Sequence, residues 1–340
     1  MRVTNWISTL FTLTVLLLVG IISSFSLPIL WSWLVPLWNF IEDKDKLPFL
    51  LNVFSTLATI TGGIILFLNY LNARNRLKIE RRQNENRLRS ERFSKAVELL
   101  GNKELDARVG GVYSLEKLVE DFPDLHWTIM EVLVALVQER TILKLESLPN
   151  LEIWLNESPY DLRRLQQLSL KINTDTQAAL TVIGRQNHHT PDNKAINLSR
   201  TYLVGADLSQ GNFQYVNFEG AILIGANLNE VNLREANIND ADLRYASVTW
   251  ADLSGAKISK TNCEGANFLC SKLENSDLED SNFSKANLAD TNLKEAIISG
   301  TIFNEVHGLM PEQIQEAISM KKAMLYGSGF LRYGAQIKGS

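Results

Sequence analysis

The sequence predicts an all-β coil of short strands, preceded by an α-helical region and by two membrane-spanning helices. Three observations support this prediction. Residues 196–305 repeat with a period of five, residues 74–144 show apolar side chains at helical spacing, and residues 1–73 contain two long uncharged stretches. A chain of 340 residues is long enough for two or three domains.

Residues 1–73 are predicted to form two transmembrane helices, at about 6–25 and 48–70, joined by a short extracytoplasmic loop. No charged residue occurs from Val3 to Ile41 or from Leu47 to Ala73, and about 20 apolar residues suffice to cross the hydrocarbon core of a bilayer. A cleaved signal peptide is the alternative for the first stretch, but the stretch is too long and lacks a small-x-small cleavage site. Whether residues 26–41 extend the first span or lie in the membrane interface stays open.

The charges that flank the second span predict its orientation. Lys44 and Lys46 are the basic residues of the loop between the spans, whereas eight basic residues follow span two: Arg74, Arg76, Lys78, Arg81, Arg82, Arg87, Arg89 and Arg92. Lys and Arg near membrane ends stay preferentially on the cytoplasmic side. Both termini are therefore expected in the cytoplasm, in a multi-pass protein of the cell inner membrane or a thylakoid membrane.

Residues 74–144 are predicted to form a basic helix and a helical hairpin. Because Glu80, Glu85 and Glu91 interrupt the basic run and aromatic partners for base stacking are missing, we interpret it as a solvated helix that touches anionic lipid headgroups. It is expected to continue the second span as one helix to Leu100. Apolar residues at helical spacing follow.

Residues 145–195 are predicted to be a helical connector, made of shorter pieces broken at Pro159 and Gly184. The most apolar part of this connector is Ala178 to Ile183.

Residues 196–305 consist of 22 consecutive five-residue repeats without an insertion. Two residues before the central position stands a small residue, most often Ala and otherwise Ser, Thr, Val or Gly, with Ile only at Ile196. The central residues are Leu198, Leu203, Leu208, Phe213, Phe218, Leu223, Leu228, Leu233, Ile238, Leu243, Val248, Leu253, Ile258, Cys263, Phe268, Leu273, Leu278, Phe283, Leu288, Leu293, Ile298 and Phe303. All are apolar apart from Cys263, which behaves as a small hydrophobe when buried.

A period of five matches neither the 3.6 of a helix nor the 2 of a strand as one continuous element. In extended backbone, residues two apart face the same side, so the small and the central residue of each repeat both point inward before a bend restarts the pattern. Glycines such as Gly205 and Gly255 are typical of such bends. We therefore expect side chains to fill the interior of the coil and to leave no cavity for a substrate.

The repeats resemble those of the pentapeptide-repeat proteins, whose A(D/N)LXX signature occurs here as ANLNE, ADLSG, ANLAD and TNLKE. This resemblance covers about a third of the chain. It implies a right-handed quadrilateral β-helix, a solenoid with four repeats in each coil. Residues 90–140 and the stretch QAALTVIGRQ are also similar to the helical region of membrane-anchored, cyanobacterial-type members of the family.

The open ends of such a coil need covers, because unpaired strand edges favour aggregation. Residues 306–340 are predicted to form a C-terminal helical cap and tail. The cap helix is expected from Pro311 to Met324, since Pro suits the first turn of a helix and helix formers follow it.

One group of apolar residues falls at outward positions of the first two coils, where polar residues are expected. This docking patch consists of Tyr202, Val204, Ile222 and Ile224. An apolar outer surface is usually covered. We expect the helical region, at Ala178 to Ile183 and its neighbours, to pack there.

A second outward group is a candidate partner contact. It consists of Trp250 with Leu269 and Cys270 stacked one coil further along. Scattered apolar surface residues are common, so the alternative is that this group has no binding role.

The sequence contains no catalytic chemistry, and the protein is predicted not to be an enzyme and to bind no cofactor or metal. A glycine-rich phosphate loop, a serine nucleophile elbow and zinc-ligand spacing are all missing. The adjacent His188 and His189 have no Cys or carboxylate cluster at ligand spacing and indicate a solvated loop. Cys263 and Cys270 are too few for a disulfide framework, which favours a reducing compartment.

The leading functional hypothesis is a non-catalytic protein-binding scaffold on the cytoplasmic face of a membrane. Its protein partner is unknown, and a homo-oligomer is one arrangement that fits. A sensory or transport accessory subunit is one alternative, although neither predicted span carries an ionisable residue that would mark an ion path.

The other alternative is a DNA-mimicking, gyrase-binding protein, since some soluble pentapeptide-repeat proteins inhibit DNA gyrase by presenting an acidic rod. Residues 196–305 hold 15 Asp and Glu against 8 Lys and Arg. Lysines such as Lys257 and Lys285 interrupt the acidic surface, however, and an anchor would hold the protein away from the chromosome. Direct binding of nucleic acid is not expected.

Overall fold

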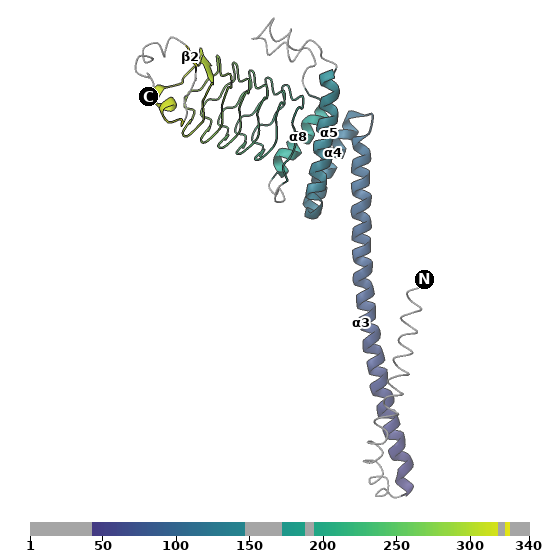
Figure 1. The fold of residues 1–340 in the computed structure, drawn as a ribbon. Coiled ribbons are helices and arrows are strands. Elements are labelled where there is room, and N and C mark those ends of the chain that lie inside the picture. The colour runs from purple at the N-terminus through teal and green to yellow at the C-terminus, as the bar shows by residue number, and fades with distance from the viewer. Residues whose placement is uncertain (1–42, 147–171, 188–193, 319–323, 327–340) are drawn as a thin grey trace. The chain divides into compact units, whose positions relative to one another are not determined.

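The computed structural model describes residues 43–146, 172–187, 194–318 and 324–326. It divides into two units, Met1–Glu85 and Asn86–Ser340, and the second unit contains the coil (Figure 1). The first predicted span, at about 6–25, lies outside the described residues, as do His188 and His189.

The long helix α3 extends from Asp43 to Leu100, so the region of the second predicted span and the basic run form one continuous helix. It begins earlier than expected, because Asp43 and Lys44 of the predicted loop already lie in it. Within the residues described, no helix was found to be both long and apolar enough to traverse a membrane, a finding that does not support the second predicted span.

Three helices form a compact group at the N-terminal end of the coil: α4 (Leu105–Asp121), α5 (His126–Glu146) and α8 (Thr174–Gln186). The short 3-10 helix η2 (Pro123–Leu125) joins α4 to α5. α8 packs against both α4 and α5, and all three contribute fully buried side chains such as Leu115, Leu133 and Leu180. The predicted two-helix hairpin is therefore completed by a third helix from the predicted connector.

A buried ion pair fixes α8 against α4. The Nε of Arg108 donates to Oδ2 of Asp175 at 2.6 Å, and the Asp175 side chain is fully buried. Arg140 of α5 brings a second guanidinium to 3.9 Å from the same oxygen, and the other carboxylate oxygen accepts the backbone N–H of Thr176 at 3.0 Å. A buried carboxylate that lost these cations would be strongly destabilising, so the pair determines where α8 can lie.

The coil is held together by parallel β-bridges between residues twenty apart, from Asn197↔Asn217 to Asn287↔His307. A spacing of twenty equals four five-residue repeats, so each coil has four sides. Figure 1 shows these coils as a stack of loops that begins beside α8. The right-handed sense of the coil remains an implication of the family resemblance.

Each repeat bends at its last residue, whose backbone lies in the left-handed region. The φ angle is 70° at Gly255 and 61° at Gly205, two of the glycines that the sequence assigns to bends. Glycine adopts this conformation without strain. At many other bends the residue is not glycine, for example Trp250 with φ of 59°. A residue with a Cβ has a higher conformational free energy in this region, and the backbone hydrogen bonds between coils offset it.

The interior of the coil is filled by side chains, as predicted. All 22 central residues are buried, including Leu228 and Leu253 in the middle of the coil. The rings of Phe268 and Phe283 lie 5.3 Å apart between centroids. Burial also raises the pKa of the Cys263 thiol well above its usual value.

Several buried hydroxyl groups in the later coils donate to the backbone of the preceding coil. Oγ1 of Thr261 donates to the carbonyl oxygen of Ile238 at 2.8 Å, and Oγ1 of Thr301 donates to that of Leu278 at 2.8 Å. Ser and Thr can therefore replace Ala at the small position without leaving a buried polar group unpaired.

The C-terminal end of the coil is closed by a shorter helix than the sequence predicts. The strand β1 (Ile302–Asn304) pairs in parallel with β2 (Met324–Tyr326). Helix α9 spans only Pro311–Gln315, where the side chain of Gln313 donates to the carbonyl oxygen of Thr291 at 2.6 Å. The predicted helix to Met324 is thus wrong at its end, because Met324 continues the sheet at the open edge of β1.

Candidate functional site

The candidate site is the outer surface of the coil, and its first feature is the way α8 closes the N-terminal end. In later coils, the N–H of Asn217 donates to the carbonyl oxygen of Ile196, twenty-one residues earlier, at 2.9 Å. In the first coil, the N–H of Asn212 donates to the carbonyl oxygen of Gly184 at 2.8 Å. α8 therefore occupies the place of a preceding coil and accepts a backbone hydrogen bond from the first coil.

A glutamine side chain of α8 makes two further hydrogen bonds that a preceding coil would otherwise make. The backbone N–H of Asp207 donates to Oε1 of Gln177 at 2.9 Å, and Nε2 of Gln177 donates to the carbonyl oxygen of Asp207 at 2.6 Å. One amide side chain thus reproduces both hydrogen bonds of a neighbouring strand.

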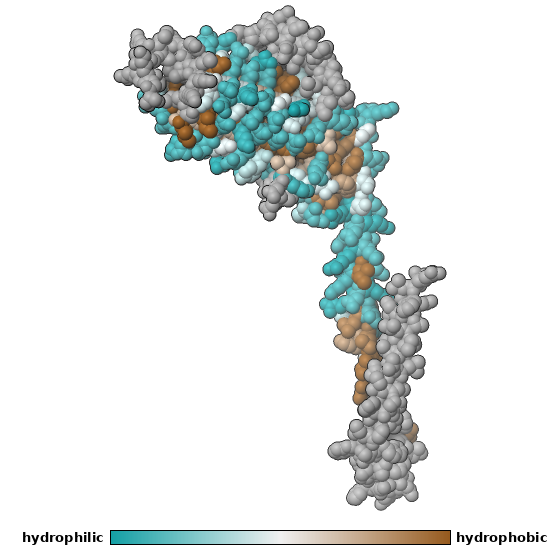
Figure 2. All heavy atoms as spheres, in the orientation of Figure 1, coloured by the Kyte–Doolittle hydropathy of each residue, from teal (hydrophilic) through white to brown (hydrophobic). Residues whose placement is uncertain are grey.

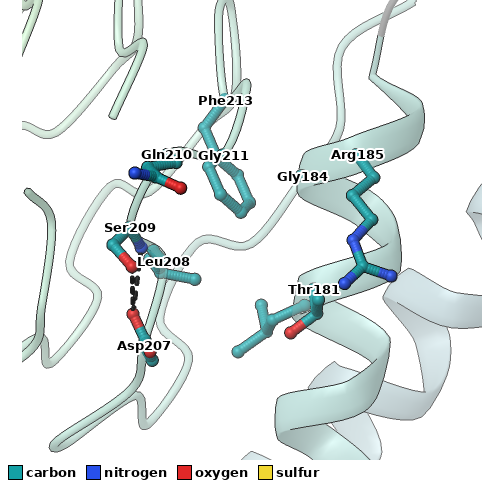
Figure 3. Close-up of a pocket in the computed structure, with 10 residues that line it drawn as sticks. Thr181, Gly184, Arg185, Asp207, Leu208, Ser209, Gln210, Gly211 and Phe213 are labelled. Carbon is teal, nitrogen blue, oxygen red and sulfur yellow. Dashed lines mark hydrogen bonds between the residues drawn. The ribbon is translucent and has the colours of Figure 1, made fainter. Parts of the chain in front are cut away.

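Gly184 lies inside α8 and does not break a helix there, contrary to the sequence prediction. A Cβ at this position would lie 2.9 Å from Cε2 of Phe213, too close for a normal contact. Figure 3 shows the Phe213 ring directed toward this turn of α8. Glycine is needed for the close approach of the helix to the coil, and the sequence alone offers no signal that distinguishes this role from a helix break.

The docking patch is buried at the positions where the sequence predicts a cover. Tyr202, Val204 and Ile224 are buried, and Ile222 is half-buried and packs against the core. Burial raises the pKa of Tyr202 to about 12. The N–H of Ile172, just before α8, lies 3.4 Å from the carbonyl oxygen of Val204. α8 itself contacts Asp207 and Asn212 at the end of the first coil, so docking of Ala178 to Ile183 on this patch stays a prediction.

The same side of the coil becomes charged in the third and fourth coils. Arg244 donates to Asp242 with its Nη2 at 2.5 Å, and this hydrogen bond raises the pKa of the guanidinium. Lys285 donates to Oε1 of Glu264 at 3.0 Å one coil further. These side chains pair with each other along the surface and face solvent in part.

The candidate partner contact lies on another side of the coil. Trp250 is 66% exposed, and its backbone N–H donates to the carbonyl oxygen of Leu269 at 3.0 Å. Cys270 stacks at the equivalent bend one coil further, and both Leu269 and Cys270 are half-buried. Trp250 and Cys270 thus occupy equivalent bends of neighbouring coils, twenty residues apart, and their role in binding a partner stays a prediction.

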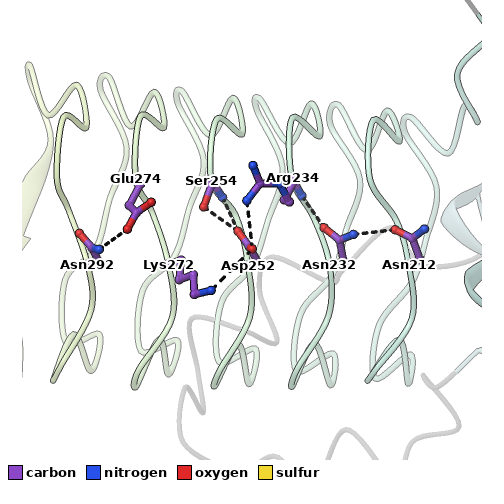
Figure 4. Close-up of polar contacts among 8 residues, drawn as sticks. All are labelled: Asn212, Asn232, Arg234, Asp252, Ser254, Lys272, Glu274 and Asn292. Carbon is purple, nitrogen blue, oxygen red and sulfur yellow. Dashed lines mark hydrogen bonds and ion pairs between the residues drawn. The ribbon is translucent and has the colours of Figure 1, made fainter.

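A polar ladder runs along a third side of the coil (Figure 4). Nδ2 of Asn232 donates to Oδ1 of Asn212 at 2.9 Å, and Asp252 accepts a hydrogen bond from Nη1 of Arg234 at 3.3 Å. Lys272 lies 4.0 Å from the same carboxylate. Partial burial raises the pKa of Asp252, but hydrogen bonds from Ser254 and the charge of Arg234 together outweigh it, so that the pKa is lowered. The carboxylates of this side are engaged by neighbours and do not form an acid–base pair.

A groove of about 310 Å³ lies between α8 and the first coil, lined in part by Thr181, Arg185, Asp207 and Gln210 (Figure 3). The side chain of Asp207 accepts a hydrogen bond from the hydroxyl of Ser209 at 2.6 Å. Within the described ranges, no group of three or more His, Cys, Asp or Glu side chains is placed to hold a metal ion.

These features define a class of protein: a β-solenoid of five-residue repeats with a solid core. Residues 195–228, 212–248, 246–284 and 271–307 match the family described as pentapeptide repeats. The match to the pentapeptide-repeat family therefore covers the coil, about a third of the chain.

Solved structures similar to the chain carry the same repeats. Rfr23, a pentapeptide repeat protein from the cyanobacterium Cyanothece 51142, is 28% identical with a TM-score of 0.25, and the match covers 30% of this chain and 64% of that protein. A pentapeptide repeat protein from the thylakoid lumen of Arabidopsis thaliana is 28% identical with a TM-score of 0.22, and the match covers 29% and 66%. The chain thus spans less than two thirds of the length of either protein.

Full-length QnrB1, a plasmid-mediated fluoroquinolone resistance protein, is 16% identical with a TM-score of 0.20, and the match covers 42% of this chain and 90% of QnrB1. None of the curated proteins matches the chain.

Proposed function

We propose that this protein is a non-catalytic protein-binding scaffold held at the cytoplasmic face of a membrane by its N-terminal region. The observation that carries the proposal is the solid interior of the coil, in which all 22 central residues are buried. A coil without internal space can bind a partner only on its sides and ends. Binding therefore depends on the outward residues, which the repeat leaves free to vary.

The composition of α3 supports the membrane anchor. Within the unit Met1–Glu85, α3 exposes a run of large apolar side chains from Ile60 to Tyr70, including Leu66 at 71% and Phe67 at 60%. At about 100° per residue, this run places apolar side chains on every side of the helix, and a helix that is apolar all round is normally buried in protein or lipid. Figure 2 shows an apolar stretch of α3 followed by a hydrophilic one.

Two further features of the sequence support the anchor and its orientation. The uncharged stretch from Val3 to Ile41 supplies a second apolar segment. The basic residues that follow Ala73 favour the cytoplasm for the rest of the chain.

The partner surface is proposed at Trp250, Leu269 and Cys270. A large aromatic residue that is exposed beside other apolar side chains is typical of the centre of a protein interface. Tyr215 provides a matched control, because it is another exposed aromatic residue at a left-handed bend of the coil, with φ of 62°.

Crosslinking in native membranes, followed by mass spectrometry, tests this proposal. We expect wild type and Tyr215→Ala to yield the same crosslinked protein, and Trp250→Ala to lose it with an unchanged melting temperature. An identical set of crosslinks in all three proteins would refute the partner surface. Release of the whole chain from membranes by alkaline carbonate would refute the anchor.

A gyrase-binding role is the second candidate, and the acidity of the coil favours it, with 15 acidic and 8 basic residues in 196–305. Several of these carboxylates are already paired with basic side chains, as Glu264 is with Lys285, which weakens the resemblance to a polyanion. A supercoiling assay with the full chain tests this role: inhibition of gyrase would promote it, and unchanged supercoiling would remove it.

A further inference from the structure

We propose that α3 carries a binding site for the headgroups of anionic phospholipids, formed by Arg74, Lys78, Arg81 and Arg82. This basic stripe directly follows the apolar run that ends at Tyr70. The inference rests on the proposed membrane anchor and identifies the class of lipid that the anchor region recognises.

The four side chains of the basic stripe share one face of α3. At about 100° per residue, they fall within an arc of roughly 100°, and all four residues are exposed. Arg76 lies on the opposite face by the same geometry. A cluster of four cations on one face of a helix is an electrostatic site for phosphate groups.

Among the described residues, the basic residues in the later part of α3 form ion pairs with carboxylates, whereas those of the basic stripe do not. Beyond the stripe, Arg89 contacts Asp124 at 2.6 Å, and Arg92 contacts Asp121 at 2.9 Å. Arg87 is paired within the helix, at 3.5 Å from Glu91. No carboxylate partner is present for the four stripe residues in the part of the chain that the structure describes. The cations next to the apolar run are thus available to an external anion, whereas the later ones bind the protein itself.

The distances along the helix agree with this division. At about 1.5 Å per residue, the stripe extends from roughly 6 to 18 Å beyond Tyr70. This interval covers the headgroup layer and one screening length of about 8 to 10 Å at physiological ionic strength. Arg89 and Arg92 belong to the second unit and have partners in the protein.

The same charges fit a nucleic acid less well. The stripe covers only about 12 Å of helix, and the sequence from Arg74 to Arg92 contains no aromatic residue on which a base could stack. Glu85 lies within the arc of the stripe and would repel a continuous polyanion. The neighbouring apolar run, by contrast, requires an apolar environment such as lipid.

The test uses the full chain reconstituted in vesicles of equal parts phosphatidylglycerol and phosphatidylcholine, with lipids near the protein measured by native mass spectrometry. The stripe variant carries Arg74→Gln, Lys78→Gln, Arg81→Gln and Arg82→Gln. The control variant removes the same charge at exposed positions elsewhere: Arg87→Gln, Lys95→Gln, Lys103→Gln and Lys117→Gln.

We expect wild type and control to retain phosphatidylglycerol over phosphatidylcholine by about five- to tenfold, since one cation near an anionic surface contributes about fivefold. The stripe variant should lose most of this preference. The preference should also fall between about 0.1 M and about 1 M salt. Equal retention of the two lipids by wild type, or an equal loss in the control, would overturn the inference.

Two further measurements separate this inference from the proposals it rests on. If alkaline carbonate releases wild type from the vesicles, the anchor fails as well; if wild type stays but shows no lipid preference, only the headgroup site fails. Tighter binding of wild type to duplex DNA than to phosphatidylglycerol, lost in the stripe variant alone, would assign the stripe to nucleic acid and overturn the lipid site.

Discussion

One side of the coil carries two kinds of surface on the same backbone. The equivalent outward position is Val204 in the first coil, Ile224 in the second, Arg244 in the third and Glu264 in the fourth. The first two are buried and the last two are half-exposed and paired. The repeat therefore determines the course of the chain, and the outward residues decide which surface is covered and which is open.

The largest change in the free energy of unfolding is expected when a residue of one surface is replaced by its counterpart from the other. Ile224→Glu removes a buried apolar side chain and places a carboxylate among apolar groups, and should reduce the free energy of unfolding by about 4 kcal/mol. The matched change Glu264→Ile should alter it by less than about 1 kcal/mol. Urea unfolding of both variants measures the difference, and equal effects would contradict a covered first surface.

The next effect concerns the helix that closes the covered end. Asp175→Ala leaves Arg108 and Arg140 without the carboxylate that they share and should reduce the free energy of unfolding of the helical group by about 3 kcal/mol. The exposed Glu279→Ala should change it by less than about 0.5 kcal/mol. Hydrogen exchange of the amide of Asn212, which donates to α8, reports whether the helix has separated from the coil.

The covered surface contributes a pH dependence to the stability of the protein through Tyr202. The pKa of Tyr202 is raised from 10.0 to about 12 by burial, so the folded protein keeps the phenol proton at pH values where the unfolded chain has lost it. The contribution of Tyr202 to stability should be constant below pH 10 and should be lost between pH 10 and about 12. In urea unfolding measured across this pH range, Tyr202→Phe should show a smaller decrease in the free energy of unfolding than wild type. An identical pH profile of the two proteins would contradict a raised pKa of Tyr202.

The smallest effect is expected at the exposed Trp250. Trp250→Gly should raise the free energy of unfolding by about 0.5 kcal/mol, because the bend has φ of 59° and glycine adopts it without strain. Trp250→Ala should leave it nearly unchanged. Thermal unfolding of the two variants checks the order, and a clear loss of stability in either would show that Trp250 packs against a covering segment.

The repeat made much of this fold predictable from sequence. A central residue such as Leu228 could be assigned to the interior because the frame of five continues without interruption through 22 repeats. The outward positions of Tyr202 and Trp250 followed from the same frame, and one proved buried and the other exposed.

Other features depend on contacts between distant parts of the chain and left no local pattern. Nothing in the sequence near Asp175 indicates that Arg108, 67 residues earlier, neutralises it. Gly184 resembles a helix break until Phe213 is placed beside it. Met324 follows a stretch of helix formers, yet it forms a strand because β1 offers a free edge. Such pairings become visible only when the chain is folded.

The carbonyl oxygen of Gly184, which accepts the N–H of Asn212, has a consequence for how the chain is made. α8 leaves the ribosome before any repeat does, so a template for the first rung exists when the repeats begin to emerge. Each later coil of twenty residues can then form its backbone hydrogen bonds with the coil that was folded before it. The column can grow during translation in one direction, without waiting for its far end.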